Sequence, residues 1–341
     1  MTSANEETPS NSRRKATWQQ TCPRFKPCLG AGIKKDQTLD DFYTFVRYPV
    51  IASPKLDGIR CLLLNNPILD AQISRPVCRS LLDVPNHYLF GHLSLMPPGL
   101  DGELITYHPG DMFDKTEKVK PFYRIQSDIM SFNSGFPIFK YHIFDYHDFN
   151  AKYPHMEPFA HRLEKLKRLN LPAQCVLVEQ RLCRDREELE AFREDCVKQG
   201  YEGICWRHPD SHYKYGRSTQ REQILMKSKD FIDDEAVIIG VYEEMQNNNP
   251  QTLNALGSPE RSSHQSNMKG KGRLGGLTLR CKNFDMDFDC GSGFDADQRQ
   301  NMWFAKETLI GKTVTFKYQP FGSKDRPRIP IFKSIRTEVD L

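Results

Sequence analysis

The sequence predicts an α+β protein in two parts, and the pattern of apolar residues carries this prediction. From residue 24 to 232, strand-like apolar runs alternate with amphipathic helical segments. From 233 to 341 the pattern is strand-rich, with about five short strands, and a small β-barrel of the OB type is the usual fold at that size. Residues 1–23 are polar and rich in Ser, Thr and Asn, which predicts a flexible tail.

In the first part, apolar side chains spaced one helical turn apart predict two helices, the second ending at Gly200. Their apolar stripes are Leu163, Leu166 and Leu169 in one helix, and Leu189, Phe192 and Cys196 in the other. Strands are predicted at 58–64, 99–107, 136–146, 201–207 and 223–229. These stripes and runs indicate packing and, by themselves, no chemistry.

In the second part, strands are predicted at 235–244, 275–281, 286–290 and 313–319. Between the first two lies a polar insert at about 245–276, with four Lys or Arg residues and one acid. Its composition favours a solvated loop. The alternative is an insert that closes over a phosphate backbone, with Lys269, Lys271 and Arg273 as its cations.

The bulk composition favours an intracellular protein without a membrane partner. No run of about 18 apolar residues exists, and the first twenty residues lack the apolar core of a signal peptide. The ten cysteines show no CxxC spacing, so we expect reduced thiols and no zinc site. The net charge of +4 permits an anionic partner without requiring one. No dimerisation stripe is evident, so a monomer is expected.

The stretch "SPKLDGIR" places charged residues at the edge of an apolar strand. Lysine becomes a nucleophile when burial or nearby cations lower its pKa, which makes Lys55 a candidate. On a strand, Lys55 and Asp57 would share one face, and Gly58 would allow a ligand to approach the backbone closely. Taken alone, a surface Lys–Asp ion pair explains the pattern better.

Four further strands are interrupted by charge in the same way, and together they predict a cleft with converging polar groups. The interrupting residues are Asp101 and Glu103, Glu202, Lys227 and Lys229, and Asp145 next to Phe144. Cations can neutralise phosphates, carboxylates can bind a divalent metal or ribose hydroxyls, and an aromatic ring can stack on a base. This set of side chains is typical of a nucleoside triphosphate site.

Two other kinds of site are excluded by spacing. "LIGKTV" has the GK[ST] ending of a phosphate-binding loop, but Lys306 stands where that motif needs its first glycine. No GxGxxG follows a strand, and no GxSxG is present for a serine nucleophile. Side chains would therefore have to bind the triphosphate.

The motifs resemble, in order, those of the covalent nucleotidyltransferases: ATP-dependent DNA ligases, RNA ligases and mRNA capping enzymes. "KLDGIR" is similar to the K-x-D-G-x-R signature, and the pieces that follow it are "SRPVCRSL", "DGEL", "YHIFDY", "YEGICWR" and "ILMKSK". The chain is most similar to minimal, virus-type ATP-dependent DNA ligases, from residue 45 to 341, including "KYGRST" and "GSKDRPRIP". No separate N-terminal DNA-binding domain is evident.

The resemblance implies an ATP-grasp-like nucleotidyltransferase domain of antiparallel sheets and helices at 24–232, and an OB domain at 233–341. It also implies that a lysine takes AMP from ATP, passes it to the 5′-phosphate of a nick in duplex DNA, and is restored when the 3′-hydroxyl seals the nick. Mg²⁺ or Mn²⁺ would offset the phosphate charge. The compartment stays open, and a virus-encoded enzyme acting in a host cell is one case.

For the nucleotide, the resemblance implies a role for most of the charged interruptions. Lys55 would be the nucleophile, and Asp57 would position it. Phe144 would stack on adenine, while Ser53 would place a hydroxyl beside the nucleotide. The remaining groups would be Arg60 and Glu103 at the sugar, Glu202 with Glu103 at the metal, and Lys227 and Lys229 at the α-phosphate.

For the other steps, the resemblance implies that Arg75 and Arg217 hold the 5′-phosphate of the nick. Arg328, Arg336 and Asp340 would act in the first step, on the pyrophosphate side, so the OB domain would have to move between steps. The insert at 245–276 lies where the family has a DNA-clasping latch, which reverses the preference for a plain loop.

Two alternatives remain. An RNA ligase or a capping enzyme would use the same lysine, but the C-terminal "PRIPIFKSIR" and the insert favour a DNA ligase. A non-enzymatic nucleic-acid clamp would show decay of the lysine motif, yet every charged position of that motif is filled.

Overall fold

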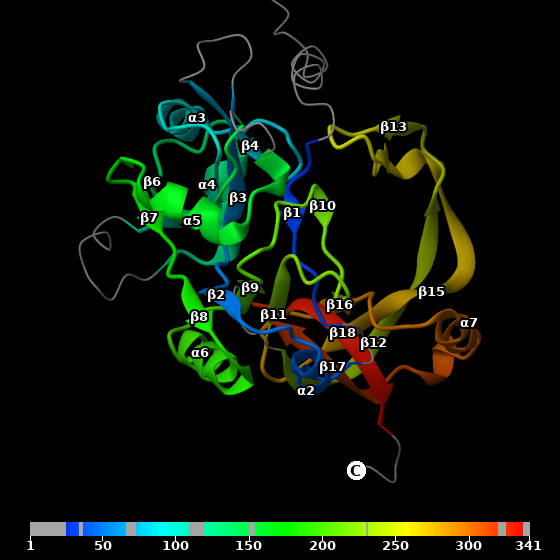
Figure 1. Ribbon diagram of the computed structural model, residues 1–341. Coiled ribbons are helices and arrows are strands. Elements are labelled where there is room, and N and C mark those ends of the chain that lie inside the picture. Colours follow the sequence, from blue (N-terminus) through cyan, green and yellow to red (C-terminus); the bar gives the residue numbers. More distant parts are fainter. Residues whose placement is uncertain are drawn as a thin grey trace, which may run out of the picture. The chain divides into compact units, whose positions relative to one another are not determined.

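The computed structural model describes residues 25–33, 37–65, 73–108, 119–149, 154–229, 231–319 and 325–336. The chain forms two compact units, shown in Figure 1. Unit 1 comprises the described residues of Met1–Ile33 and Thr38–Ser228, and unit 2 those of Lys34–Gln37 and Lys229–Leu341. The predicted tail, residues 1–23, lies outside the described residues.

The larger sheet of unit 1 has five strands, antiparallel except for the last pair. In spatial order the strands are β4 (Ser74–Cys78), β3 (Ile59–Asn65), β5 (Leu100–Tyr107), β6 (Ile138–Tyr146) and β7 (Cys175–Leu177). Helices α3 (His87–Ser94), α4 (Phe122–Met130) and α5 (Phe159–Lys167) pack against it. Leu163 and Leu166 of the predicted stripe are buried in the shared core, and Leu169 packs at its edge.

The smaller sheet of unit 1 has the order β11 (Met226–Lys229), β9 (Gly203–Arg207), β2 (Val50–Pro54) and β8 (Arg181–Cys183). It packs with α2 (Leu39–Thr44) and α6 (Arg186–Lys198). Helix α6 is capped at its N-terminus by Asp185, whose carboxylate accepts the Glu188 N–H at 2.9 Å, and it ends before Gly200, which has φ +88°. The predicted stripe of α6 is buried.

A short segment before α2, the strap (Phe25–Ile33), lies beside this sheet. Its strand β1 (Cys28–Leu29) pairs in parallel with β10 (Gly216–Arg217). The Ala31 N–H donates to the Leu225 carbonyl at 2.9 Å, and the Ala31 carbonyl accepts the Lys227 N–H at 2.8 Å. The ring of Phe25 contacts four other aromatic rings, which fixes the start of the strap.

Unit 2 is built on an antiparallel five-stranded sheet that closes on itself. The order is β16 (Phe288–Cys290), β15 (Met268–Arg280), β12 (Ile232–Asn247), β17 (Thr313–Gln319) and β18 (Arg328–Ile335). Beyond β16, Ser292 bridges to Ile331, and the Phe332 N–H donates to the Ser292 carbonyl at 2.9 Å. Helix α7 (Ala296–Phe304) packs on β15. The predicted barrel strands are therefore present, and they are linked across both edges.

The insert at 245–276, called the arm below, differs from the plain loop that its composition favours. Strands β12 and β15 stay paired as far as Asn247 and Met268, and the small hairpin of β13 (Gln251–Leu253) and β14 (Pro259–Arg261) stands between them. Figure 1 shows this arm in yellow beyond the sheet of unit 2. The sequence hides these strands because both of their faces meet solvent, so the apolar alternation of a half-buried strand is missing.

The nine cysteines in the described residues are free thiols, as predicted. None of the helices in the described ranges has the length and apolar character that crossing a membrane requires.

Candidate active site

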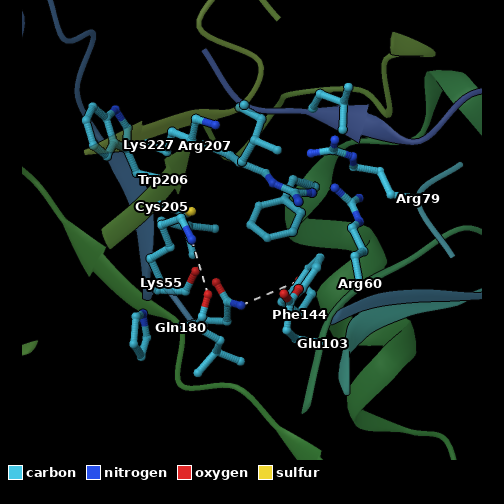
Figure 2. Close-up of a pocket in the computed structure, with 18 of the residues that line it drawn as sticks. Lys55, Arg60, Arg79, Glu103, Phe144, Gln180, Cys205, Trp206, Arg207 and Lys227 are labelled. Carbon is cyan, nitrogen blue, oxygen red and sulfur yellow. Dashed lines mark hydrogen bonds between the residues drawn. The ribbon is translucent and has the colours of Figure 1, made fainter. Parts of the chain in front are cut away.

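Unit 1 contains a pocket where both of its sheets and the strap meet (Figure 2). The labelled side chains that line it are Lys55, Arg60, Arg79, Glu103, Phe144, Gln180, Cys205, Trp206, Arg207 and Lys227. Ser53, Arg217 and the strap residues Leu29 and Gly30 also line it. The predicted cleft of charged strand ends therefore exists, although several charged residues have other positions.

Lys55 follows β2 directly, and its N–H donates to the Gly203 carbonyl at 2.9 Å, which fixes its backbone against β9. Its amine donates to the Leu56 carbonyl at 3.1 Å and forms an ion pair with the Glu202 carboxylate. The side chains are 18% and 3% exposed. Burial lowers the pKa of Lys55, but the negative charges around it, Glu202 first, leave that pKa above its ordinary value. In this state the lysine is a charged ammonium.

Glu103 lies on β5 beside the lysine. Burial raises the pKa of Glu103 to about 7, against the positive charges of Lys55 and Arg60 and the Gly58 N–H, which lower it. Gly58 is required at this point because a Cβ there would lie 2.4 Å from the Leu104 carbonyl and 2.8 Å from the Glu103 side chain. The glycine of the "KLDGIR" motif thus lets β5 and its carboxylate approach the lysine.

Arg60 is held rigidly between the large sheet and the strap. Its Nε and Nη2 donate to the two oxygens of Asp101 at 2.8 and 2.6 Å, and its Nη1 donates to the Cys28 carbonyl at 2.6 Å. The guanidinium lies 5.3 Å from the centre of the Phe144 ring. The Phe144 carbonyl accepts a long hydrogen bond from Gln180 at 3.5 Å. One wall of the pocket is therefore a preorganised arginine next to an aromatic ring.

Asp101 and Asp145, which the sequence placed among the cleft residues, do not line the pocket. Both are buried and lie opposite each other on β5 and β6. Asp101 pairs with Arg60, and Asp145 pairs with Arg162 and Arg207. These five residues form the buried charge cluster. Asp145 occupies a core position of the alternating strand β6, so its charge requires internal partners.

The residues predicted to bind phosphate are only partly brought together. Lys227 and Arg217 line the pocket, and Arg217 donates to the Gly30 carbonyl at 3.1 Å. Arg75 does not line it and forms an ion pair with Asp83 at 2.6 Å. Lys229 does not line it either; it is the first residue of the second segment of unit 2, and its amine donates to Gln319 of the same unit at 3.4 Å.

Asp57 is partly buried and is not among the residues that line the pocket. In unit 2, Arg328 and Arg336 lie on β18 and directly after it, and Arg336 forms an ion pair with Glu235. Asp340 lies outside the described residues. On the arm, Lys271 and Arg273 both pair with Glu244, whereas Lys269 is exposed and has no ion pair within the described residues.

Four features of the pocket escaped prediction: Arg79, Gln180, Arg207 and the strap. Arg79 belongs to the segment "SRPVCRSL", in which the resemblance assigns a role to Arg75 and none to Arg79. Arg207 ends a predicted strand, Gln180 lies outside the predicted elements, and the strap has no motif of its own. Only tertiary pairing brings these three features to the pocket.

A lysine, a stackable ring and several cations in one pocket, in a unit followed by a small barrel, define an enzyme that transfers nucleotidyl groups. The family described as "ATP dependent DNA ligase domain" matches residues 41–229, and the "DNA ligase OB-like domain" matches residues 267–336. The chain belongs to the ATP-dependent DNA ligase family. The predicted fold class and resemblance are confirmed.

Individual proteins show the same similarity. A DNA ligase of Haemophilus influenzae is 25% identical over 298 residues, which cover 85% of this chain and 89% of that protein. The chlorella virus DNA ligase-adenylate is 28% identical, with 92% and 99% covered and a TM-score of 0.47. A Lig E DNA ligase is 21% identical, with 90% and 98% covered and a TM-score of 0.61, and this likeness concerns the fold alone. The protein is an ATP-dependent DNA ligase that seals nicks in DNA, as predicted.

Proposed function

We propose that Lys55 carries the adenylate during this reaction. Its neutral amine attacks the α-phosphorus of ATP, so that an N–P bond forms, the bond to the β-phosphate oxygen breaks, and pyrophosphate leaves with the electron pair. The nick 5′-phosphate then attacks the same phosphorus and releases the lysine. Finally the 3′-hydroxyl attacks the 5′-phosphate, and AMP leaves.

The position of Lys55 supports this role most directly. It is the lysine of the pocket whose amine is held at both a carbonyl and a carboxylate, and the Arg60–Phe144 wall lines the same pocket. Phe144 is suited to stack on adenine, and Ser53 offers a hydroxyl on the same wall as Lys55. Asp57 keeps the positioning role that the resemblance implies.

The ion pair with Glu202 keeps the nucleophile inactive until substrate binds. A protonated amine has no free electron pair, so attack requires loss of the proton. Because Glu202 raises the pKa of Lys55, any event that draws the carboxylate away lowers that pKa and favours the neutral amine. Substrate binding and activation of the lysine are coupled in this way.

The carboxylates of this pocket fit Mg²⁺, which usually keeps several water molecules as ligands. Glu202 forms an ion pair with Lys55, and Glu103 lines the same pocket. No group of three or more His, Cys, Asp or Glu residues suited to a metal is found in the described parts of the chain. One or two carboxylates plus substrate phosphates are the usual protein share for Mg²⁺, which would offset phosphate charge.

Unit 2 would act on DNA and on the leaving pyrophosphate. The arm carries Lys269, Lys271 and Arg273, which are suited to a phosphate backbone by charge. Arg328, Arg336 and Asp340 keep the first-step role implied by the resemblance. A monomer, an intracellular location, a Mn²⁺ alternative and a free N-terminal tail remain predictions.

The test uses ATP labelled at its α-phosphate, with Mg²⁺, followed by unlabelled nicked duplex. We expect a labelled protein that loses its label as sealed DNA appears. Lys55→Ala should take up no label, whereas Lys140→Ala, which removes a lysine of β6 outside the pocket, should label normally. Equal labelling of wild type and Lys55→Ala would refute the lysyl-AMP.

A further inference from the structure

The segment "SRPVCRSL" contains two arginines, and the sheet register separates them. Arg75 is paired with Leu64, and Cys78 is paired with Cys61. Arg79 therefore follows β4 beside Arg60, at the pocket end of β3, whereas Arg75 lies four residues further along the strand. At about 3.3 Å per residue, that separation is about 13 Å. Figure 2 shows Arg79 and Arg60 together on one side of the pocket.

The two arginines also differ in their partners. The Nε of Arg75 donates to the Asp83 carboxylate at 2.6 Å, and both side chains are largely buried. Arg79 is exposed, lines the pocket and forms no ion pair with any described residue. An arginine presents a planar fork of donors that matches a phosphate group. Arg79 has this fork available, whereas that of Arg75 is engaged by a carboxylate.

Arg79 belongs to a group of positive charges that have no ion-pair partner among the described residues. Arg217 and Lys227 line the same pocket from β10 and β11. Burial lowers the pKa of Lys227, and the positive charges of Lys55, Arg217 and Arg79 lower it further. Cations that repel one another in this way are stabilised when an anion binds between them. The geometry therefore indicates a site for a phosphate group.

We propose that Arg79, together with Arg217, binds the 5′-phosphate of the nick, the place that the resemblance gives to Arg75. This inference rests on the proposed function. A DNA phosphate must arrive from solvent, and Arg79 is exposed, while Lys55, Arg60 and Glu103 are more deeply placed. The other phosphate source is ATP itself, and the experiment distinguishes the two.

The test uses enzyme already adenylylated on Lys55, in EDTA, with two duplexes that differ only in a 5′-phosphate or a 5′-hydroxyl at the nick. The wild type should prefer the phosphate. Arg79→Ala should lose about 10- to 100-fold of this preference, as expected for one charged hydrogen-bond partner, and Arg79→Lys should lose less. The matched control Arg168→Ala removes an exposed arginine that is not part of the pocket and should keep the preference.

Two results would overturn the proposal. One is an Arg79→Ala enzyme with the same preference for the phosphorylated nick as the wild type. The other is a loss confined to the KM for ATP in self-adenylylation, which would assign Arg79 to the triphosphate. If the wild type itself takes up no label on Lys55, the proposed lysyl-AMP fails, and that failure is read separately from the binding preference.

Discussion

Two carboxylates in the described residues, Asp145 and Glu244, each bridge two cations, and they differ strongly in burial. Asp145 joins Arg162 and Arg207 inside unit 1, and it is fully buried. Glu244 joins Lys271 and Arg273 on the arm of unit 2, and its side chain is 24% exposed. The first carboxylate supports the pocket from within, whereas water can replace either partner of the second. The same chemical motif is therefore a structural support in one unit and an exchangeable contact in the other.

Asp145→Asn should have the largest effect on stability. The change leaves two buried guanidinium groups without a counter-charge, which costs about 3–5 kcal/mol of unfolding free energy. Glu244→Gln, the matched change next to the arm, should cost less than about 1 kcal/mol. Denaturant unfolding followed by tryptophan fluorescence measures both, because Trp206 is buried in unit 1 and Trp303 packs against the core of unit 2. Similar losses in both variants would contradict the distinction by burial.

This contrast also explains how far the sequence could predict the site. Asp145 and Glu202 both follow apolar residues on strands, and the linear pattern gives them equal weight. Only the fold shows that Glu202 faces Lys55, while Asp145 faces Arg162 across the core. The motifs predicted which segments form the pocket, because each motif is a short stretch of neighbouring residues and can be seen without the fold.

Long-range pairing was not visible in the sequence. Arg79 reaches the pocket through the β3–β4 register, and the strap reaches it through β10, about 190 residues away. The arm escaped prediction for a different reason. Its strands exist, but they cover no core, so their apolar residues do not alternate along the chain. Apolar periodicity predicts burial first, and secondary structure only through burial.

The pH dependence of stability should show the next largest effect. Glu103 has a pKa of about 7 in the folded protein and about 4.3 when unfolded. Since the folded state binds the proton more tightly, this contribution is fully present below about pH 4.3 and is lost as the pH rises through 7. Between pH 5 and 8, the wild type should lose about 1–3 kcal/mol relative to Glu103→Gln.

The control for this measurement is Glu187→Gln, which removes an exposed acid of α6 in the same unit. Its stability should follow the wild-type pH profile. If the profile of Glu103→Gln is also parallel to that of the wild type, Glu103 does not hold a proton at neutral pH, and it would already be ionised for a metal.

Glu244→Gln, which changes the partner of two arm cations, should strengthen DNA binding. The Glu244 carboxylate holds Arg273 and Lys271, and these hydrogen bonds lower its pKa to about 2, so it stays charged at any working pH. Replacing it frees two cations for phosphates. We expect nicked DNA to bind about two- to fivefold more tightly, with a steeper salt dependence, in a titration at several salt concentrations. Weaker binding would mean that the pair holds the arm in its binding shape.

Lys269 and Lys271 allow the most closely matched comparison of two cations, because they lie two residues apart on β15 and differ in their ion pairs. Lys271 is neutralised by Glu244, whereas Lys269 is exposed and has no ion pair within the described residues. Lys269→Ala should weaken nick binding about two- to fivefold and lower the salt slope by about 0.9, the value for one phosphate contact. Lys271→Ala should change both quantities less, because Glu244 is already its partner. Equal slopes for the two variants would show that DNA displaces Glu244 from the lysine, and the arm would then bind phosphates with all of its cations.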